Sequence, residues 1–203
     1  MTGCGCEFEI TRQEQQKVLW WLLLINAVMF VVELITGVIA DSTGLIADSL
    51  DMLADATVYG IALYAVGHSA IAKTRAAHLS GVFQIVLAIG IFADVLRRWM
   101  MGSEPQSDLI ILISLFALAA NVLCLKLISK HRNGEVHMRA SWIFSKNDVL
   151  ANLGVILSGV LIYLSGSRWP DLIIGAVITL LVLRGGMSIV KDAKAEKLKI
   201  ISA

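Results

Sequence analysis

Long apolar stretches alternate with short polar segments along the 203 residues of the chain. Each stretch is roughly 20 residues long, the length that a helix needs to cross a ~30 Å hydrocarbon core at about 1.5 Å per residue. Backbone groups inside lipid must pair with one another, and the alternation typical of barrel strands is missing. The pattern therefore predicts six membrane-spanning helices, at residues 18–40, 44–67, 79–100, 107–129, 141–166 and 171–190.

The composition favours the same fold class. The chain is 57% hydrophobic and 16% charged, whereas soluble domains are about 45–50% apolar and about 25% charged. We therefore expect an all-α integral membrane protein whose surroundings are a lipid bilayer. The formal net charge is +1, and no long basic run is present. We expect no nucleic-acid partner.

The distribution of Lys and Arg predicts the orientation of the chain. If the N-terminus is cytoplasmic, 13 Lys and Arg residues lie on the cytoplasmic side and three on the other side. Both termini are thus predicted to be cytoplasmic, in a multi-pass protein of the plasma membrane, of the bacterial inner-membrane type. The expected domains are a cytoplasmic segment at 1–17, a transport domain at 18–190 and a short cytoplasmic tail at 191–203, with no soluble C-terminal domain.

Three aspartates of the second apolar stretch carry the first sign of function. Asp48, Asp51 and Asp55 are spaced i, i+3 and i+7, which places them on one face of a helix. A charge at membrane depth costs about 2.5–3.5 kcal/mol or more. Three like charges on one face also repel, unless a cation or protons lie among them. Metal binding is one interpretation; hydrogen bonding to other helices is the alternative, above all for Asp48.

The fifth apolar stretch supplies a second group of oxygen ligands. Asp148 and Asn152 are one helical turn apart and share a face, and Ser145 and Asn147 lie beside them. A carboxylate with amide oxygens suits a hard or borderline divalent ion. The alternative is that Ser145, Asn147 or Asp148 caps the start of the helix.

Cys4 and Cys6 form a Cys-x-Cys pair near the N-terminus, with Glu7 and Glu9 beside them. Two thiols can capture a soft ion, although a closed zinc site needs four ligands. An incidental tail is the alternative. Cys124 lies in an apolar stretch and is expected to be a core residue, so no disulfide framework is implied.

The histidines argue against a membrane-bound metalloenzyme. His68, His78, His131 and His137 are predicted to lie in loops, and no two of them have the i, i+4 spacing of paired ligands on a helix. We therefore expect neither enzymatic activity nor a resident cofactor.

Two spaced motifs resemble those of the cation diffusion facilitator family. The first matches the second-helix signature and reads Glu33-x3-Gly37-x4-Ser42-x2-Leu45-Ile-Ala-Asp48-Ser-Leu-Asp51-x3-Asp55. The second matches its partner in helix five and reads Asp148-Val-x2-Asn152. The resemblance covers the whole predicted membrane region and implies a six-helix bundle of cation-efflux type. It implies export of divalent metals, chiefly zinc, in exchange for protons, with Asp51, Asp55 and Asp148 as ligands.

The chain departs from the family pattern at Phe144, where many members have His or Asp. Asn147, Ser145, Asn152 or water would then complete the site. Zinc is the expected ion, with cadmium, cobalt, iron and manganese as alternatives. The second departure is the missing C-terminal domain, so a homodimer would use the membrane helices.

The expected mechanism is alternating access, in which protons compete for the carboxylates and release the metal. Asp48 is expected to support the site or handle protons. The alternatives are a metal channel, an uptake carrier, or a non-transporting membrane component of a metal-resistance system.

Overall fold

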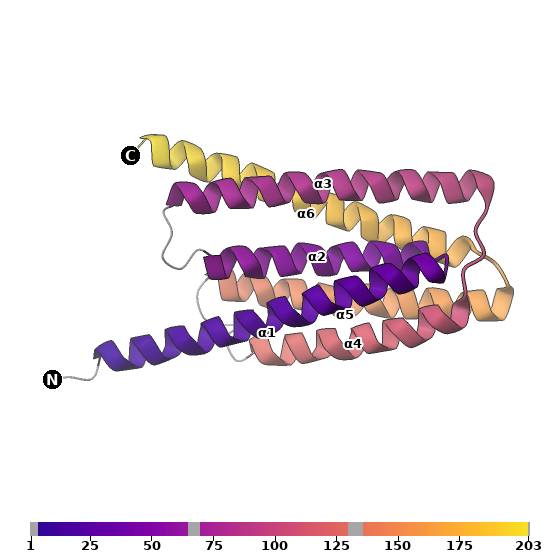
Figure 1. Cartoon of the computed structure of the whole chain (residues 1–203), viewed down its shortest axis with the longest axis horizontal. Coiled ribbons are helices and arrows are strands. Elements are labelled where there is room, and N and C mark those ends of the chain that lie inside the picture. Colours follow the sequence, from indigo (N-terminus) through magenta and orange to yellow (C-terminus); the bar gives the residue numbers. More distant parts are fainter. Residues whose placement is uncertain (1–3, 65–69, 130–135, 203) are drawn as a thin grey trace.

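The computed structural model describes residues 4–64, 70–129 and 136–202. Six helices and no strand occupy these residues, and they form an antiparallel bundle with both termini at one end (Figure 1). This confirms the predicted all-α six-helix fold. The helices are α1 (Cys4–Ile39), α2 (Thr43–Tyr64), α3 (Ala70–Met101), α4 (Ser107–Ser129), α5 (Val136–Ser165) and α6 (Trp169–Ser202). Side chains are outside the description at helix positions 4–12, 15, 70, 73, 136–145, 199, 201 and 202.

We call the end of the bundle that holds both termini the terminal end, and the opposite end the far end (Figure 1). At the terminal end the helices run past the predicted spans. Helix α1 begins at Cys4, α3 begins at Ala70 rather than at 79, and α6 continues to Ser202. The strongly apolar pattern ends before these helices end, because Lys, Glu and Ala are good helix formers and continue a helix beyond an apolar stretch. His78 therefore lies in α3 and not in a loop.

Five of the described helices are long and apolar enough to cross a membrane. Helix α2 has 22 residues, or about 33 Å, so it is long enough to cross a membrane. It is not among the five because its three aspartates make it less apolar. It packs against α1, α3, α5 and α6, so its polar face meets protein rather than lipid. The chain is thus a multi-pass membrane protein in which α2 forms the centre of the bundle.

At the far end, a side chain of α6 caps the start of α2. Both oxygens of Asp171 accept hydrogen bonds, from Ser42 Oγ at 2.6 Å, from the Thr43 amide at 2.6 Å and from the Gly44 amide at 3.0 Å. The first amides of a helix lack partners within that helix, and here another helix provides them. Because Asp171 is fully buried, these contacts join α2 and α6 inside the protein.

A second polar contact at the far end joins α3 to the turn between α1 and α2. Arg98 donates to the backbone oxygen of Asp41 at 2.6 Å, to the Asp41 carboxylate, and to Asp94 Oδ2 at 2.5 Å. Asp41 adopts a positive φ of 50° and also accepts from the amide of Glu104 at 2.7 Å. Together with the Asp171 cap, this network ties most of the helix ends together at the far end.

Candidate metal-binding site

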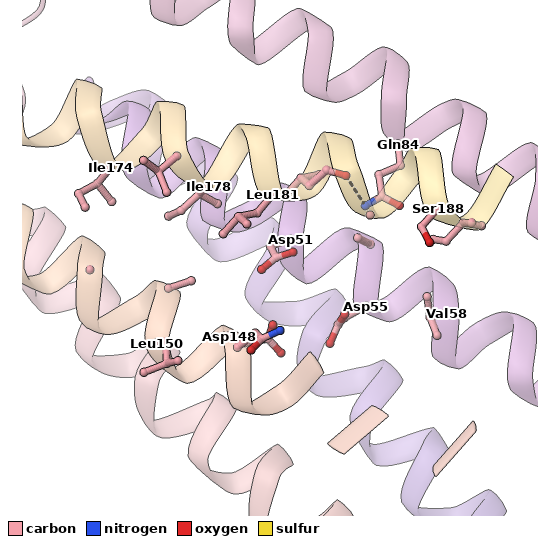
Figure 2. Close-up of a pocket in the computed structure, with 18 of the residues that line it drawn as sticks. Asp51, Asp55, Val58, Gln84, Asp148, Leu150, Ile174, Ile178, Leu181 and Ser188 are labelled. Atoms are coloured by element: carbon pink, nitrogen blue, oxygen red, sulfur yellow. Dashed lines mark hydrogen bonds between the residues drawn. The ribbon is translucent and has the colours of Figure 1, made fainter. Parts of the chain in front are cut away.

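A cavity of about 570 Å³ lies between α2, α3, α5 and α6 (Figure 2). Its polar lining comes from all four helices, and no described lining residue is Lys or Arg. A cavity with carboxylates and no fixed cation attracts cations from solution. The polar lining residues are Asp51, Asp55, Gln84, Asn147, Asp148, Ser188 and Asp192.

Three of the predicted ligands face this cavity. Figure 2 shows Asp51 and Asp55 on α2 opposite Asp148 on α5. Both Asp55 and Asp148 line the cavity, and both residues are buried, at 6% and 7% exposure. Carboxyl groups gathered in one buried cavity need protons or a cation between them. The fold therefore brings together acids that are almost one hundred residues apart in the sequence.

The three carboxylates share a cavity but do not form a compact coordination sphere. Within the described ranges, no group of three or more His, Cys, Asp or Glu side chains converges closely enough to hold a metal ion. Ligation by all three aspartates therefore requires side-chain rotation or a small approach of α5 to α2.

Tyr59 supports the site from behind. Its hydroxyl donates a hydrogen bond of 2.9 Å to Oδ2 of Asp55, one turn away on α2. Tyr59 is fully buried, so this contact fixes the carboxylate from the protein side. The sequence analysis missed this residue, although its i+4 spacing from Asp55 was a readable signal.

Asn147 lines the cavity with Asp148, but Asn152 does not. The Asn152 amide donates to the backbone oxygen of Asp148 at 3.0 Å, and its own side-chain oxygen is buried without a hydrogen-bond partner. Asn152 thus lies on α5 one turn after Asp148, outside the lining of the cavity. The side chains of Phe144 and Ser145 lie outside the described part of the chain, as do those of Cys4 and Cys6.

Asp48 lies apart from the cavity. It is 1% exposed, and Glu33 of α1 is completely buried. Neither oxygen of Glu33 accepts a hydrogen bond from any described N–H or hydroxyl group, and Asp48 Oδ2 also has no such partner. A buried carboxyl group at membrane depth is tolerated when it is protonated or lies beside a cation. A supporting or proton-handling role for Asp48 stays a prediction.

Three polar cavity residues were not singled out from the sequence. Gln84 donates to the backbone oxygen of Val182 at 3.1 Å, and Ser188 donates to Asp192 Oδ2 at 3.4 Å. Ser188 and Asp192 lie toward the terminal end of α6, just before and just after residue 190, where the predicted span ends. The polar approach to the aspartates therefore comes from the terminal end of the bundle.

The lining closer to the far end is apolar. Ile174, Ile178 and Leu181 of α6 form this part of the wall (Figure 2). An ion that leaves the aspartates toward the far end would meet hydrocarbon side chains, which cannot replace its hydration shell. The lining is thus apolar on the far-end side of the carboxylates, whereas Ser188 and Asp192 lie on the terminal side.

Comparison with known proteins gives the chain a family. A model of the cation efflux transmembrane domain matches residues 19–196. The cadmium, cobalt and zinc/H(+)-K(+) antiporter of Bacillus velezensis is 28% identical over 58% of this chain and 38% of its own length. The zinc transporter ZitB of Escherichia coli is 26% identical over 62% of this chain and 41% of its own length.

A ZitB protein of Pectobacterium atrosepticum is 26% identical over 93% of this chain and 63% of its own length. The chain thus spans less than two thirds of each of these relatives. They are named as transporters rather than as enzymes, and they are bacterial. Since the family model covers nearly all of the described helical bundle, the chain belongs to the cation diffusion facilitator family of the plasma membrane.

Proposed function

We propose that the chain exports divalent metal cations in exchange for protons. The observation that carries this proposal is the cavity in which Asp51 and Asp55 of α2 face Asp148 of α5, without a described basic residue in its lining. A transported cation can replace the protons that such a group of acids otherwise needs. The relatives named as metal antiporters and zinc transporters support the same class of substrate.

In the proposed binding state, Asp51, Asp55 and Asp148 bind the ion as carboxylates. Asn147, which lines the cavity, or water completes the coordination. Zinc remains the expected substrate, with cadmium, cobalt, iron and manganese as competitors, because oxygen ligands discriminate weakly among these ions. Asn152 and Ser145 are proposed as further polar support around Asp148.

In an alternating-access mechanism, this arrangement indicates from which side the metal enters. The polar approach through Ser188 and Asp192 opens toward the terminal end, which the Lys and Arg distribution assigns to the cytoplasm. At the far end, the contacts of Asp171 and Arg98 hold the helices together. We propose that metal enters in this arrangement, that rearrangement of the bundle opens the far end, and that protons then displace the metal.

Two further expectations belong to this proposal. Cys4 and Cys6 are proposed to capture metal before it enters the cavity. A homodimer is proposed to form through membrane helices. The boundaries of the transport domain at 18 and 190 stay a prediction.

Reconstitution into proteoliposomes with a metal-sensitive dye inside tests the proposal. The native chain should transport zinc at a rate that depends on an imposed pH gradient. Asp55→Asn should abolish transport, whereas Asp108→Asn, an exposed residue in the first turn of α4, should leave it unchanged. Zinc flux that ignores the pH gradient would contradict proton exchange and favour a channel. A folded native chain without any flux would favour a non-transporting component.

A further inference from the structure

A second cavity, also about 570 Å³, lies at the terminal end between the start of α3 and the end of α6. We call it the α3–α6 groove. It shares no lining residue with the metal cavity. Its polar lining is strongly basic and consists of Arg75, His78, Lys194, Lys197 and Thr74.

The groove lies next to a close crossing of α3 and α6. A Cβ atom at Gly81 would lie 2.9 Å from Val190 Cγ2 and 3.1 Å from the backbone oxygen of Gly186. The helices are therefore in near backbone contact at this point. Toward the terminal end they enclose the groove, where Thr74 and Ala193 are buried at 8% and 6% exposure. The closely packed pair α3 and α6 thus forms the floor of the groove.

The positive charge of the groove favours an anionic ligand. Arg75, Lys194 and Lys197 carry permanent positive charges, and none of the described lining residues is acidic. Asp192 and Glu196 are close in sequence on α6 but do not line the groove. The general excess of Lys and Arg on a cytoplasmic face explains scattered cations, but not their convergence on one hollow without a carboxylate.

The remaining lining and the depth of the groove point to a lipid. Ile71, Leu79 and Ile200 add apolar surface, and Leu79 is 71% exposed. The groove spans the level at which the membrane segments begin, at Thr74, and end, at Leu198. Lys and Arg at this level extend their charged ends toward the headgroups. A soluble anion would use the charges but leave the apolar surface in contact with water.

We propose that the α3–α6 groove binds one anionic phospholipid of the cytoplasmic leaflet. Its phosphate lies among Arg75, Lys194 and Lys197, and an acyl chain runs along Leu79. Basic pockets between membrane helices on the cytoplasmic side recognise such headgroups. Since α3 and α6 also supply Gln84 and Ser188 to the metal cavity, the bound lipid stabilises one wall of that cavity.

Native mass spectrometry of the detergent-solubilised full chain tests this site, with phosphatidylglycerol as the probe and phosphatidylcholine as the neutral comparison. The native chain should retain one phosphatidylglycerol and no phosphatidylcholine. Each basic residue contributes about 1 kcal/mol to binding of an anionic lipid, so Lys194→Gln with Lys197→Gln should weaken phosphatidylglycerol binding about 30-fold. The matched control is Lys17→Gln with Lys126→Gln, which removes two exposed lysines elsewhere at the terminal end and should leave binding unchanged.

A second pair of measurements separates a lipid from a soluble anion. Leu79→Asn keeps every charge and should still weaken phosphatidylglycerol binding, whereas inorganic phosphate should not displace the lipid. If the Lys194/Lys197 variant and the Lys17/Lys126 control lost phosphatidylglycerol binding to the same extent, diffuse surface charge would explain the binding and the proposal would be overturned. Displacement by phosphate, or full binding by Leu79→Asn, would overturn it in favour of a soluble anion. Thermal unfolding without lipid checks that each variant is folded, and none of these readouts depends on metal transport.

Discussion

The hydroxyl of Tyr59 donates a 2.9 Å hydrogen bond to Oδ2 of Asp55 from one turn further along α2. Tyr59→Phe removes this bond and keeps the ring, so the carboxylate loses its fixed orientation toward the cavity. Loss of such a supporting contact commonly weakens metal binding by about 10-fold or more. Isothermal titration of the purified chain with zinc should show this change. Tyr163→Phe, at an exposed position, is the control, and an equal loss there would exclude a specific role for Tyr59.

Zinc binding should release protons, because a metal binds the ionised form of a carboxylate. The affinity for zinc should therefore fall as the pH falls. Asp55 and Asp148 line the same cavity and are both buried, so protons on these two acids are expected to be displaced when zinc binds. Asp148→Asn should release fewer protons per zinc in weakly buffered solution, while Asp108→Asn releases as many as the native chain. Identical proton release from all three would rule out Asp148 as a ligand.

Phe144 lies one turn before Asp148 in α5, where an imidazole would add a ligand for zinc. Phe144→His should raise the preference for zinc over manganese in a panel of transported metals, because nitrogen ligands favour zinc. Phe144→Leu controls for loss of the ring and should not change the preference. If both variants changed it alike, packing rather than ligation would be the cause.

Gly175 allows α6 to approach the start of α2. A Cβ atom there would lie 2.7 Å from Thr43 Cγ2 and 2.8 Å from the Thr43 carbonyl carbon. Gly175→Ala should destabilise the bundle by about 1–3 kcal/mol, because the backbone cannot move aside without breaking the Asp171 cap. Thermal unfolding in detergent should show a lower Tm. Gly90→Ala has nothing within 4 Å of its added methyl group and should be neutral or slightly stabilising.

The apolar pattern was sufficient to predict the number and order of the helices. It was not sufficient to predict where each helix ends. The extension of α6 beyond residue 190 is mostly polar, so no apolar pattern indicates its last residue. The pairing of α3 with α6 is likewise invisible in the sequence. The sequence therefore could not show that Gln84 and Ser188 line the cavity, whereas the folded structure does.

The spacing of the α2 aspartates predicts which of them share a helix face, but not which neighbours they contact. Asp48, Asp51 and Asp55 share a face, but along the helix axis Asp48 lies about 4.5 Å from Asp51 and about 10.5 Å from Asp55. Asp51 and Asp55 line the cavity, whereas Asp48 does not. The spacing predicted a common face correctly, but only the neighbouring helices decide which acid meets which partner.

The cap that Asp171 places on α2 also constrains the order of assembly during synthesis. Three aspartates would cost α2 roughly 8–10 kcal/mol at the centre of a bilayer, so this helix depends on protein neighbours to stay inserted. The amides of Thr43 and Gly44 at its start donate to Asp171, which lies 128 and 127 positions later in the chain. The ribosome must therefore complete most of the chain before α2 can reach its final position. Until then α1, its most extensive early neighbour, must shelter it from lipid.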